Sequence, residues 1–572
     1  MSSTRAISAG SLLLLLAAGL WTLSFGYTEM AGSDMWWHIA AGRELVQTGT
    51  PWMLDDWSFS AHGHPWHNHE WLADLLYYAW VSAFGVPSLV YWKWLLILAT
   101  YMLLLVTLAR VTGSWLAALP GAALAVALAA PFLDIRPHLY SLLCYSVLLY
   151  GGLGRQPRLY WLLPLFVLWV NLHGGFFFGL MALGILLFPW RAPRPAALGA
   201  ALAVGLACLL ATALNPAGLK AVLYPLGYAF DGSSPYRQLS EWLSPFVAGG
   251  IRSPLFFYVM WMPLLGLAYL LPAVRRAADV PFEGIALTLL TLAMALTSRR
   301  FIPLFGMSLA LLLSPLVALL VQRLRLERHS LALGSVLLLC ALYRLLPYSL
   351  QAAPNFHYLT AEYSYPVDML NFIEANDIRG NVYAFYNWGG YVHWRTDGAL
   401  RVFIDGRADT VYDAATYRHY VTVLGSGPGW VRELEATDAD YLLWPLRRGH
   451  GQEKLAELLA TGRWQPVYAD AVSFLLARAE QPQAGEVRPS QAGPWQELAA
   501  AHGRYREGDV TGALEHARAA HSAMPWHQGA CNLLMEGYAQ QADEARMRQV
   551  YTECRHYFPS RYIRAAHIPQ RP

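Results

Sequence analysis

The residues best suited to acid–base chemistry stand in one polar stretch, Ser33 to Tyr77, near the N-terminus. Asp34 opens a segment with helical periodicity, and His38 follows one turn later on the same face. Glu70 comes later, directly after a histidine. A carboxylate can take the proton of an attacking hydroxyl in a transfer reaction, so we predict Asp34 as the general base and Glu70 as a second catalytic carboxylate. Asp34 can equally be the N-cap of its helix, a role worth about 1 kcal/mol.

The same stretch is rich in histidine and tryptophan. Four histidines at nearly alternating positions could gather around a divalent metal in an extended or turned conformation, but their spacing fits no standard zinc motif. We therefore assign no metal ligands and keep a divalent metal as an alternative. Sugar stacking and anchoring at a membrane interface explain the tryptophans equally well. These residues are His62, His64, His67 and His69, with Trp36, Trp37, Trp52, Trp57, Trp66 and Trp71.

Other polar groups stand where apolar runs end, and the basic ones suit a phosphate. A leaving phosphate is stabilised by cations and hydrogen-bond donors. The neighbours Arg299 and Arg300 break the charge pattern of the other loops, which indicates either anion binding or two arginines that snorkel to lipid headgroups. The residues that we predict to bind substrate or carrier are His38, His69, Arg136, His138, His173, Arg299 and Arg300. We expect Asp55 and Asp56, in the first polar stretch, to be solvated.

The composition requires a membrane around these groups. Of the 572 residues, 56% are hydrophobic and only 14% are charged, which excludes an ordinary soluble enzyme. The net charge of +3 comes from basic residues scattered at the ends of apolar runs, a pattern that excludes nucleic-acid binding. We predict a polytopic α-helical membrane protein.

Apolar runs recur along the first 350 residues and predict about eleven membrane spans. The first run has no clear small-residue cleavage site after it, so we expect an uncleaved span rather than a signal peptide. The runs lie near Ile7 to Tyr27, Ser88 to Ala109, Trp115 to Leu133, Pro137 to Leu153, Leu159 to Val170, Phe176 to Phe188, Ala196 to Leu214, Pro254 to Leu271, Gly284 to Thr297, Phe301 to Val321 and Ser330 to Pro347.

Arginine clusters at alternate turns predict the orientation. Short cytoplasmic loops carry an excess of basic residues. A cytoplasmic N-terminus places most arginine clusters inside, provided that the chain turns at Asn171 to Gly175, where two glycines make a turn feasible. We therefore predict a multi-pass protein of the inner (cytoplasmic) membrane, with residues 28–87 as its first extracytoplasmic loop and the C-terminal third also extracytoplasmic.

The first loop also carries a resemblance. An N-terminal span, an aspartate that opens an interfacial helix (Asp34-Met35-Trp36-Trp37-His38), and a second interfacial helix after a proline-containing link resemble the GT-C superfamily of membrane glycosyltransferases. The protein O-mannosyltransferase and aminoarabinose transferase branch is the most similar. The resemblance covers roughly Ile7 to Tyr348 and implies transfer of a sugar from a polyprenyl-phosphate carrier, with Asp34 as the base. This chain has Met35 where the branch usually has a second acid.

After the predicted transmembrane domain of residues 1–350, we expect the rest of the chain to form soluble modules. Residues 355–480 are predicted to form a small α/β domain. Its expected strands lie near 381–386, 401–404, 441–444 and 473–476, and its expected helices near 367–375, 414–423, 429–436 and 453–459. Asp405 and Arg407, just beyond a strand end, suit either a ligand site or, as we prefer, an internal ion pair. A linker follows at 481–494.

The last segment, residues 495–572, contains a pattern that recurs loosely with an offset of 34 residues, as in tetratricopeptide repeats. Two such helix pairs are too few to stand alone, so we expect them to pack on the α/β domain or on a protein partner. Cys531 and Cys554 could form a disulfide in an oxidising compartment, but we predict two unpaired helix cysteines.

Two functions from different classes fit this sequence. The first is a glycosyltransferase that moves a sugar from a polyprenyl-phosphate carrier to an extracytoplasmic protein, glycan or lipid. The second is a non-catalytic membrane assembly or scaffold protein that acts through its soluble and repeat domains. The expected partners are the lipid-linked sugar, its acceptor, membrane lipids and a protein bound by the repeats.

Overall fold

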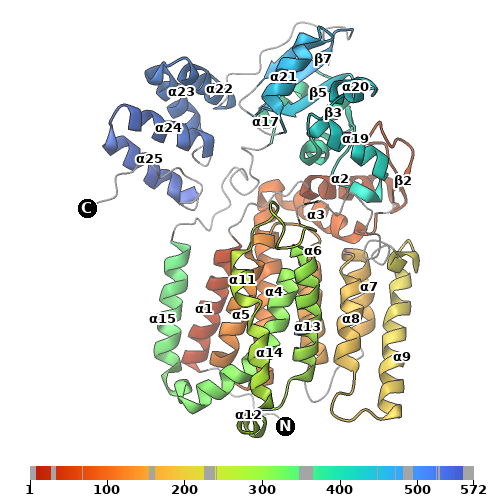
Figure 1. The fold of residues 1–572 in the computed structure, drawn as a ribbon, viewed down its shortest axis with the longest axis vertical. Coiled ribbons are helices and arrows are strands. Elements are labelled where there is room, and N and C mark those ends of the chain that lie inside the picture. The colour runs from red at the N-terminus through yellow and green to blue at the C-terminus, as the bar shows by residue number, and fades with distance from the viewer. Residues whose placement is uncertain are drawn as a thin grey trace. The chain divides into compact units, whose positions relative to one another are not determined.

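The computed structural model divides the chain into two compact units (Figure 1). The first contains Met1–Thr28, His69–Leu76 and Leu89–Leu346, and the second contains Glu29–Asn68, Tyr77–Ser88 and Pro347–Pro572. Most of the predicted first loop therefore folds with the C-terminal part of the chain. The structure describes residues 8–26, 34–66, 68–153, 161–223, 239, 241–346, 365–446, 449–469, 472–480, 494–523, 525 and 528–557.

Five of the described helices are long and apolar enough to cross a membrane by length and composition. The protein is therefore a membrane protein, as predicted. The five segments are Val86–Thr112 with α4 (Leu89–Thr112), Trp115–Phe132 with α5 (Trp115–Ala129), Pro195–Leu214 with α9 (Pro195–Ala211), Arg299–Arg323 with α14 (Ile302–Arg323), and Leu326–Leu345 with α15 (Ser330–Leu345).

The prediction of about eleven spans, and with it the GT-C-like arrangement of that many helices, is wrong for the described residues. The other apolar runs form helices of 17 residues or fewer. At 1.5 Å per residue, a 12-residue helix covers about 18 Å of a hydrocarbon core about 30 Å thick. These helices are α1 (Ala9–Phe25), α6 (His138–Gly152), α7 (Leu162–Leu172), α8 (Phe176–Leu187), α11 (Pro254–Val259) and α13 (Phe282–Thr297).

Local backbone breaks explain why the apolar runs overestimate the spans. The run from Pro254 to Leu271 is divided into α11 and a 3-10 segment (Met262–Leu270), and α12 (Pro272–Ala277) follows it. The predicted turn at Asn171 to Gly175 is confirmed, because α7 ends at Leu172 and α8 begins at Phe176. Proline lacks an N–H group and favours such breaks. Hydropathy counts apolar residues but does not detect where the helix stops.

Small residues let the helices of the first unit approach one another. Helices α4, α5, α13 and α14 run side by side in Figure 1. A Cβ atom on Gly121 of α5 would lie 3.1 Å from the Cβ of Ala310 on α14, and one on Gly306 would lie 3.3 Å from the Cα of Ala125. Glycine at these positions permits the close helix contact that packing in membranes relies on.

The second unit contains a five-stranded sheet with the order β4-β3-β5-β7-β6. Strand β3 (Gly380–Ala384) is parallel to β4 (Leu400–Val402) and to β5 (Tyr441–Pro445), whereas β7 (Ser473–Arg478) is antiparallel to β5 and to β6 (Trp464–Ala469). Four of the five strands were predicted, and β6 was missed. The helices are α17 (Val367–Ala375), α18 (Gly389–Thr396), α19 (Ala414–Leu424), α20 (Trp430–Glu435) and α21 (Gly451–Ala460).

The first polar stretch contains the two predicted helices and a small hairpin. Helix α2 runs from Asp34 to Thr48 and α3 from Trp71 to Phe84. Between them, β1 (Met53–Leu54) pairs with β2 (Pro65–Trp66). His67 and most of the predicted linker 481–494 lie outside the described residues.

Four helices form the tail: α22 (Pro494–Arg506), α23 (Val510–Ala523), α24 (Gln528–Gln540) and α25 (Glu544–Tyr557). Each packs against the next along the chain, as expected of consecutive helix pairs; their tetratricopeptide character stays a prediction. Cys531 of α24 and Cys554 of α25 form a disulfide, so the prediction of two unpaired cysteines is wrong. The packing of α24 against α25 brings together two sulfurs that are 23 residues apart in the sequence.

Candidate functional site

The predicted site residues fall into two clusters, one in each unit. In the first unit, two arginines share one carboxylate. Arg136 precedes α6, and both Nη atoms of its guanidinium donate to Glu241, with 3.3 Å between Nη2 and Oε1. Arg300, at the start of α14, places its Nη1 3.7 Å from the same Oε1 and its guanidinium 4.0 Å from the centre of the Trp242 ring. Both arginine side chains remain about a quarter exposed, at 25%.

Glu241 is ionised between these two cations. Burial raises the pKa of a carboxyl group, but the charges of Arg136 and Arg300 outweigh burial and lower the pKa of Glu241 to about 2. A second carboxylate lies nearby, because Asp134 Oδ2 is 3.9 Å from Arg136 Nε. Both guanidinium groups are partly exposed, so a second anion could approach them from solvent.

Arg299 has a different role from its neighbour. Its Nε donates to the carbonyl of Ser244 at 3.1 Å, and its two Nη atoms donate to the carbonyls of Gly249 and Val247. Only 4% of the residue is exposed. The Arg299 guanidinium therefore holds the loop 244–249, and of the predicted pair only Arg300 faces the acidic group.

His173 lies between α7 and α8 with its tautomer fixed by three donors. Trp169 Nε1 donates to the Ser141 hydroxyl at 2.7 Å, and this hydroxyl lies 2.7 Å from His173 Nδ1. The N–H of Gly175 donates to the same Nδ1 at 2.9 Å. Since Nδ1 accepts, the ring proton lies on Nε2, which is 3.6 Å from Glu70 Oε1.

Electrostatics keep this imidazole neutral and connect it to the arginines. Burial lowers the pKa of His173 well below its usual range, and the charge of Arg300 lowers it further. The 3.6 Å from His173 Nε2 to Glu70 Oε1 is longer than a hydrogen bond, and Glu70 is 9% exposed. A carboxylate that is so little exposed to water can act as a base toward a bound hydroxyl.

The supporting residues come from segments far apart in the sequence. A side chain on Gly175 would place its Cβ 2.2 Å from Ser141 Oγ, so only glycine fits there. Trp71 Nε1 donates to Asn171 Oδ1 at 2.7 Å, which ties the start of α3 to the end of α7. A second histidine, His69, lies near the same carboxylate as His173, with its Nε2 3.7 Å from Glu70 Oε1. His138 donates to the carbonyl of Phe132 at 2.6 Å.

The second unit contains the other cluster, centred on Arg407. Its Nη2 lies 2.6 Å from Asp55 Oδ1 and 2.8 Å from Asp405 Oδ2, and the Tyr412 hydroxyl donates to Asp405 Oδ2 at 2.9 Å. The Arg407, Asp55 and Asp405 side chains are fully buried, and the guanidinium lies 4.1 Å from the centre of the Trp57 ring. This confirms the internal ion pair of Asp405 with Arg407. It also shows that Asp55 is buried rather than solvated.

Asp34 and His38 are placed by this second unit. Helix α2 approaches α18 and the turn at Asp405–Arg407 so closely that a Cβ on Gly390 would lie 2.9 Å from the Trp37 backbone. A Cβ on Gly406 would lie 3.0 Å from Asp34 Oδ1. The His38 ring is stacked against Trp37, with 3.6 Å between ring centres, and is 1% exposed.

The tryptophans of the polar stretch mostly build this unit. Trp36, Trp37, Trp57 and Trp66 are buried, so they do not anchor the loop at an interface, whereas Trp52 is 62% exposed. The histidines of the stretch form no metal-type group; in the described part of the chain such a group occurs at His521, Cys531 and Cys554.

The sequence predicted several of the first-unit site residues but not the side chains that bind them. It assigned no role to Glu241, and it overlooked Ser141 and Trp169, which lie inside apolar runs. The sequence signal for Ser141 was a serine within an apolar helix whose end lies near other polar residues.

No protein-family model matches this sequence, and a comparison with curated proteins finds no match. The functional argument therefore rests on the geometry of the two clusters. The first-unit cluster is the candidate active site, because its arginines are partly exposed. The second-unit cluster is fully buried.

Glu44 of α2 supplies a testable pH dependence in the second unit. Burial and the charge of Asp56 raise the pKa of Glu44 to about 7, although Trp57 Nε1 donates to it at 2.7 Å. A raised folded-state pKa favours the protonated form, so this group stabilises the fold below pH 4.5 and loses that contribution as the pH rises through 7. The loss is at most about 3 kcal/mol.

We expect Glu44→Gln to remove this pH dependence, because a glutamine carbonyl still accepts from Trp57 and does not ionise. The measurement is amide hydrogen exchange of α2 at pH 5 and pH 8, corrected for intrinsic exchange. Glu453→Gln, at a side chain that is 65% exposed, is the control and should keep the wild-type dependence. Identical pH profiles for wild type and Glu44→Gln would contradict the assignment.

Proposed function

We propose that this protein is a membrane glycosyltransferase that moves a sugar from a polyprenyl-phosphate carrier to an acceptor hydroxyl. One observation carries the proposal: in a single unit, two partly exposed arginines share Glu241 while Glu70 lies against the N–H of a neutral His173. Group transfer from a phosphate needs a base for the nucleophile and cations for the leaving group. This cluster offers both.

The proposed reaction uses Glu70 as the base. Glu70 takes the proton of the acceptor hydroxyl, the acceptor oxygen forms a bond to the anomeric carbon, and the bond from that carbon to the phosphate oxygen breaks. The carrier leaves as polyprenyl phosphate, with its charge on the guanidinium groups of Arg136 and Arg300. Arginine suits this role because its planar donors bind two phosphate oxygens at once.

Asp34 is the base that the family resemblance implies, and it remains the second acid of the proposal. It opens α2 in the other unit, beside Gly406. Glu70 is our first choice because it shares a unit with His173 and the arginines. Arg299 acts as a positioning residue that holds the loop following Glu241.

We also propose that the protein lies in the inner (cytoplasmic) membrane with its C-terminal part outside the cytoplasm. The disulfide between Cys531 and Cys554 supports this, since disulfides persist in oxidising compartments.

Glu70→Gln is expected to lower sugar transfer by a hundredfold or more, because an amide of the same size cannot accept the proton. Cells that lack the chain are complemented with each variant, and their envelope glycans are compared by mass spectrometry. Glu283→Gln, at the opposite end of α13 from Arg299, is the control and should restore the glycans. If Glu70→Gln and Asp34→Asn each leave the glycans unchanged, with each variant protein at normal abundance, the enzyme is rejected in favour of a scaffold.

Arg300→Lys is expected to weaken binding of polyprenyl phosphate roughly tenfold, because lysine keeps the charge but loses the two-point grip. Arg300→Ala should weaken it further. The measurement is native mass spectrometry of the purified protein with added polyprenyl phosphate, and with the uncharged polyprenol for comparison. Arg276→Lys, in α12, should bind like wild type. If the wild-type protein retains polyprenyl phosphate and polyprenol equally, phosphate binding at this site is refuted.

A reporter that is active only outside the cytoplasm is expected to be active when fused after Pro354 and inactive when fused after Arg276. The reason is that basic residues such as Arg275 and Arg276 of α12 favour the cytoplasmic side of a membrane, whereas the disulfide in the C-terminal unit indicates an oxidising compartment. The opposite result at either fusion would reverse the proposed orientation.

A further inference from the structure

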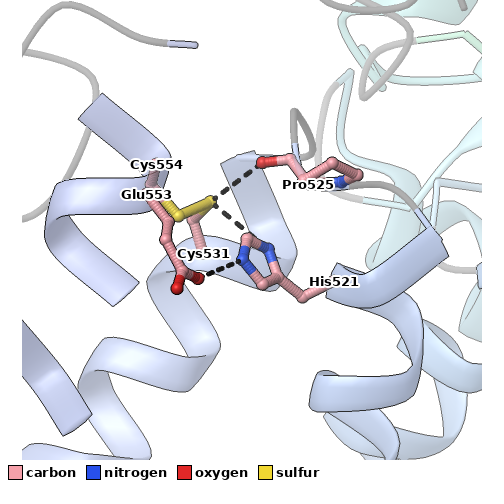
Figure 2. Close-up of a disulfide and its surroundings, with 5 residues drawn as sticks. All are labelled: His521, Pro525, Cys531, Glu553 and Cys554. Carbon is pink, nitrogen blue, oxygen red and sulfur yellow. Dashed lines mark hydrogen bonds and ion pairs between the residues drawn. A yellow bond between two sulfur atoms is a disulfide. The ribbon is translucent and has the colours of Figure 1, made fainter. Parts of the chain in front are cut away.

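The helical tail contains a cluster of ligand-type side chains that the proposed transfer reaction does not use. His521 of α23, Cys531 of α24 and Cys554 of α25 bring a ring nitrogen and two sulfurs within 4.8 Å of one another. Figure 2 shows the two sulfurs joined as a disulfide, with the His521 ring facing them. Both cysteines are fully buried, and His521 is 9% exposed.

Two acceptor atoms surround the sulfur of Cys531. His521 Nδ1 lies 3.9 Å from this Sγ, and the carbonyl oxygen of Pro525 lies 3.7 Å from it. A disulfide sulfur has no proton to donate to either atom. A thiol could donate to one of them, and a cation at this position could be bound by several of these lone pairs at once.

Glu553 selects the tautomer that turns a lone pair toward the sulfurs. Its Oε2 lies 3.4 Å from His521 Nε2 (Figure 2), so the proton belongs on Nε2 and the Nδ1 lone pair is free. A carboxylate on the far nitrogen is the arrangement that orients histidines which bind metal ions.

We propose that reduction of this disulfide creates a binding site for a zinc-type divalent cation, with Cys531 Sγ, Cys554 Sγ and His521 Nδ1 as ligands. Two thiolates and one imidazole form a soft donor set that suits zinc, and a fourth position stays open to water. The donors come from three consecutive helices, so the metal would connect α23 to α24 and α25, whereas the disulfide connects only the last two.

The chemistry of the two states makes them mutually exclusive. A dithiol reductant supplies two electrons and two protons, becomes a disulfide itself, and leaves Cys531 and Cys554 as thiols. The cation then displaces the two thiol protons and binds the thiolates. A disulfide oxidant reverses the change: it accepts two electrons from the two thiolates and two protons from water, becomes a dithiol, and the metal is released as the Cys531–Cys554 bond forms. This proposal does not depend on the transfer reaction.

The test uses the full-length protein in detergent, reduced with a phosphine that is then removed, and titrated with Co²⁺ under anaerobic conditions. We expect one equivalent of Co²⁺ to bind with thiolate-to-cobalt charge-transfer bands and the visible bands of a tetrahedral site, and Zn²⁺ to displace it. The oxidised protein should show none of these bands. Absence of the bands in the reduced wild type would overturn the proposal.

Matched variants separate this site from other thiols. Cys340→Ser, which removes an exposed free cysteine of α15, should leave the bands unchanged. The double variant Cys531→Ser/Cys554→Ser should abolish them, and persistence of the bands there would also overturn the proposal. His521→Ala keeps the disulfide available for folding and, when reduced, should weaken Co²⁺ binding at least tenfold. An unchanged Co²⁺ affinity in reduced His521→Ala would show that the imidazole is not a ligand and would contradict the proposed ligand set.

Discussion

A single guanidinium shared by two aspartates is the interaction on which the second unit depends. Arg407 binds Asp405 two residues away and Asp55 352 residues away in the sequence. A buried charge without partners is strongly destabilising, so Arg407 is tolerable only where both segments meet. Ser58 donates to Asp55, and Tyr412 donates to Asp405, which satisfies the remaining acceptors. The first polar stretch is therefore a structural part of the α/β unit.

Glycine makes that association possible. A Cβ on Gly389 would lie 2.5 Å from the Cβ of Asp405, and a Cβ on Gly390 or on Gly406 would lie 2.9 Å from Trp37. A side chain at Gly390 or Gly406 would push α2 away, and one at Gly389 would push α18 away from the turn that contains Arg407. The ion pair and the three glycines therefore act together, and they set the position of Asp34 at the start of α2.

The two arginine clusters differ in a way that bears on function. In the second unit, Arg407 is fully buried and bound by two carboxylates, so a ligand of phosphate size could not reach it, although its Nη1 has no hydrogen-bond partner among the described residues. In the first unit, Arg136 and Arg300 are 25% exposed and share Glu241. An incoming phosphate would compete there with Glu241 for donors that are already oriented. The cluster beside Glu70 is for this reason the better candidate for chemistry.

The membrane class, the turn between α7 and α8, four strands of the sheet and the ion pair of Asp405 with Arg407 could be predicted from the sequence. Each of these follows from local information: hydropathy, glycine at a break, alternation in short runs, and opposite charges two residues apart. The sequence also indicated Arg136, His173 and Arg300 as binding residues, and all three lie in the first unit.

Only the tertiary structure decided the number of long helices, the role of Arg299, the disulfide and the burial of Asp55. Helix continuity depends on local backbone breaks that hydropathy does not detect. The roles of Arg299 and Asp55 depend on partners 50 or more residues away, and the disulfide depends on how α24 packs against α25. A residue type states which interactions a side chain can make, but the packing of distant segments selects the one that it does make.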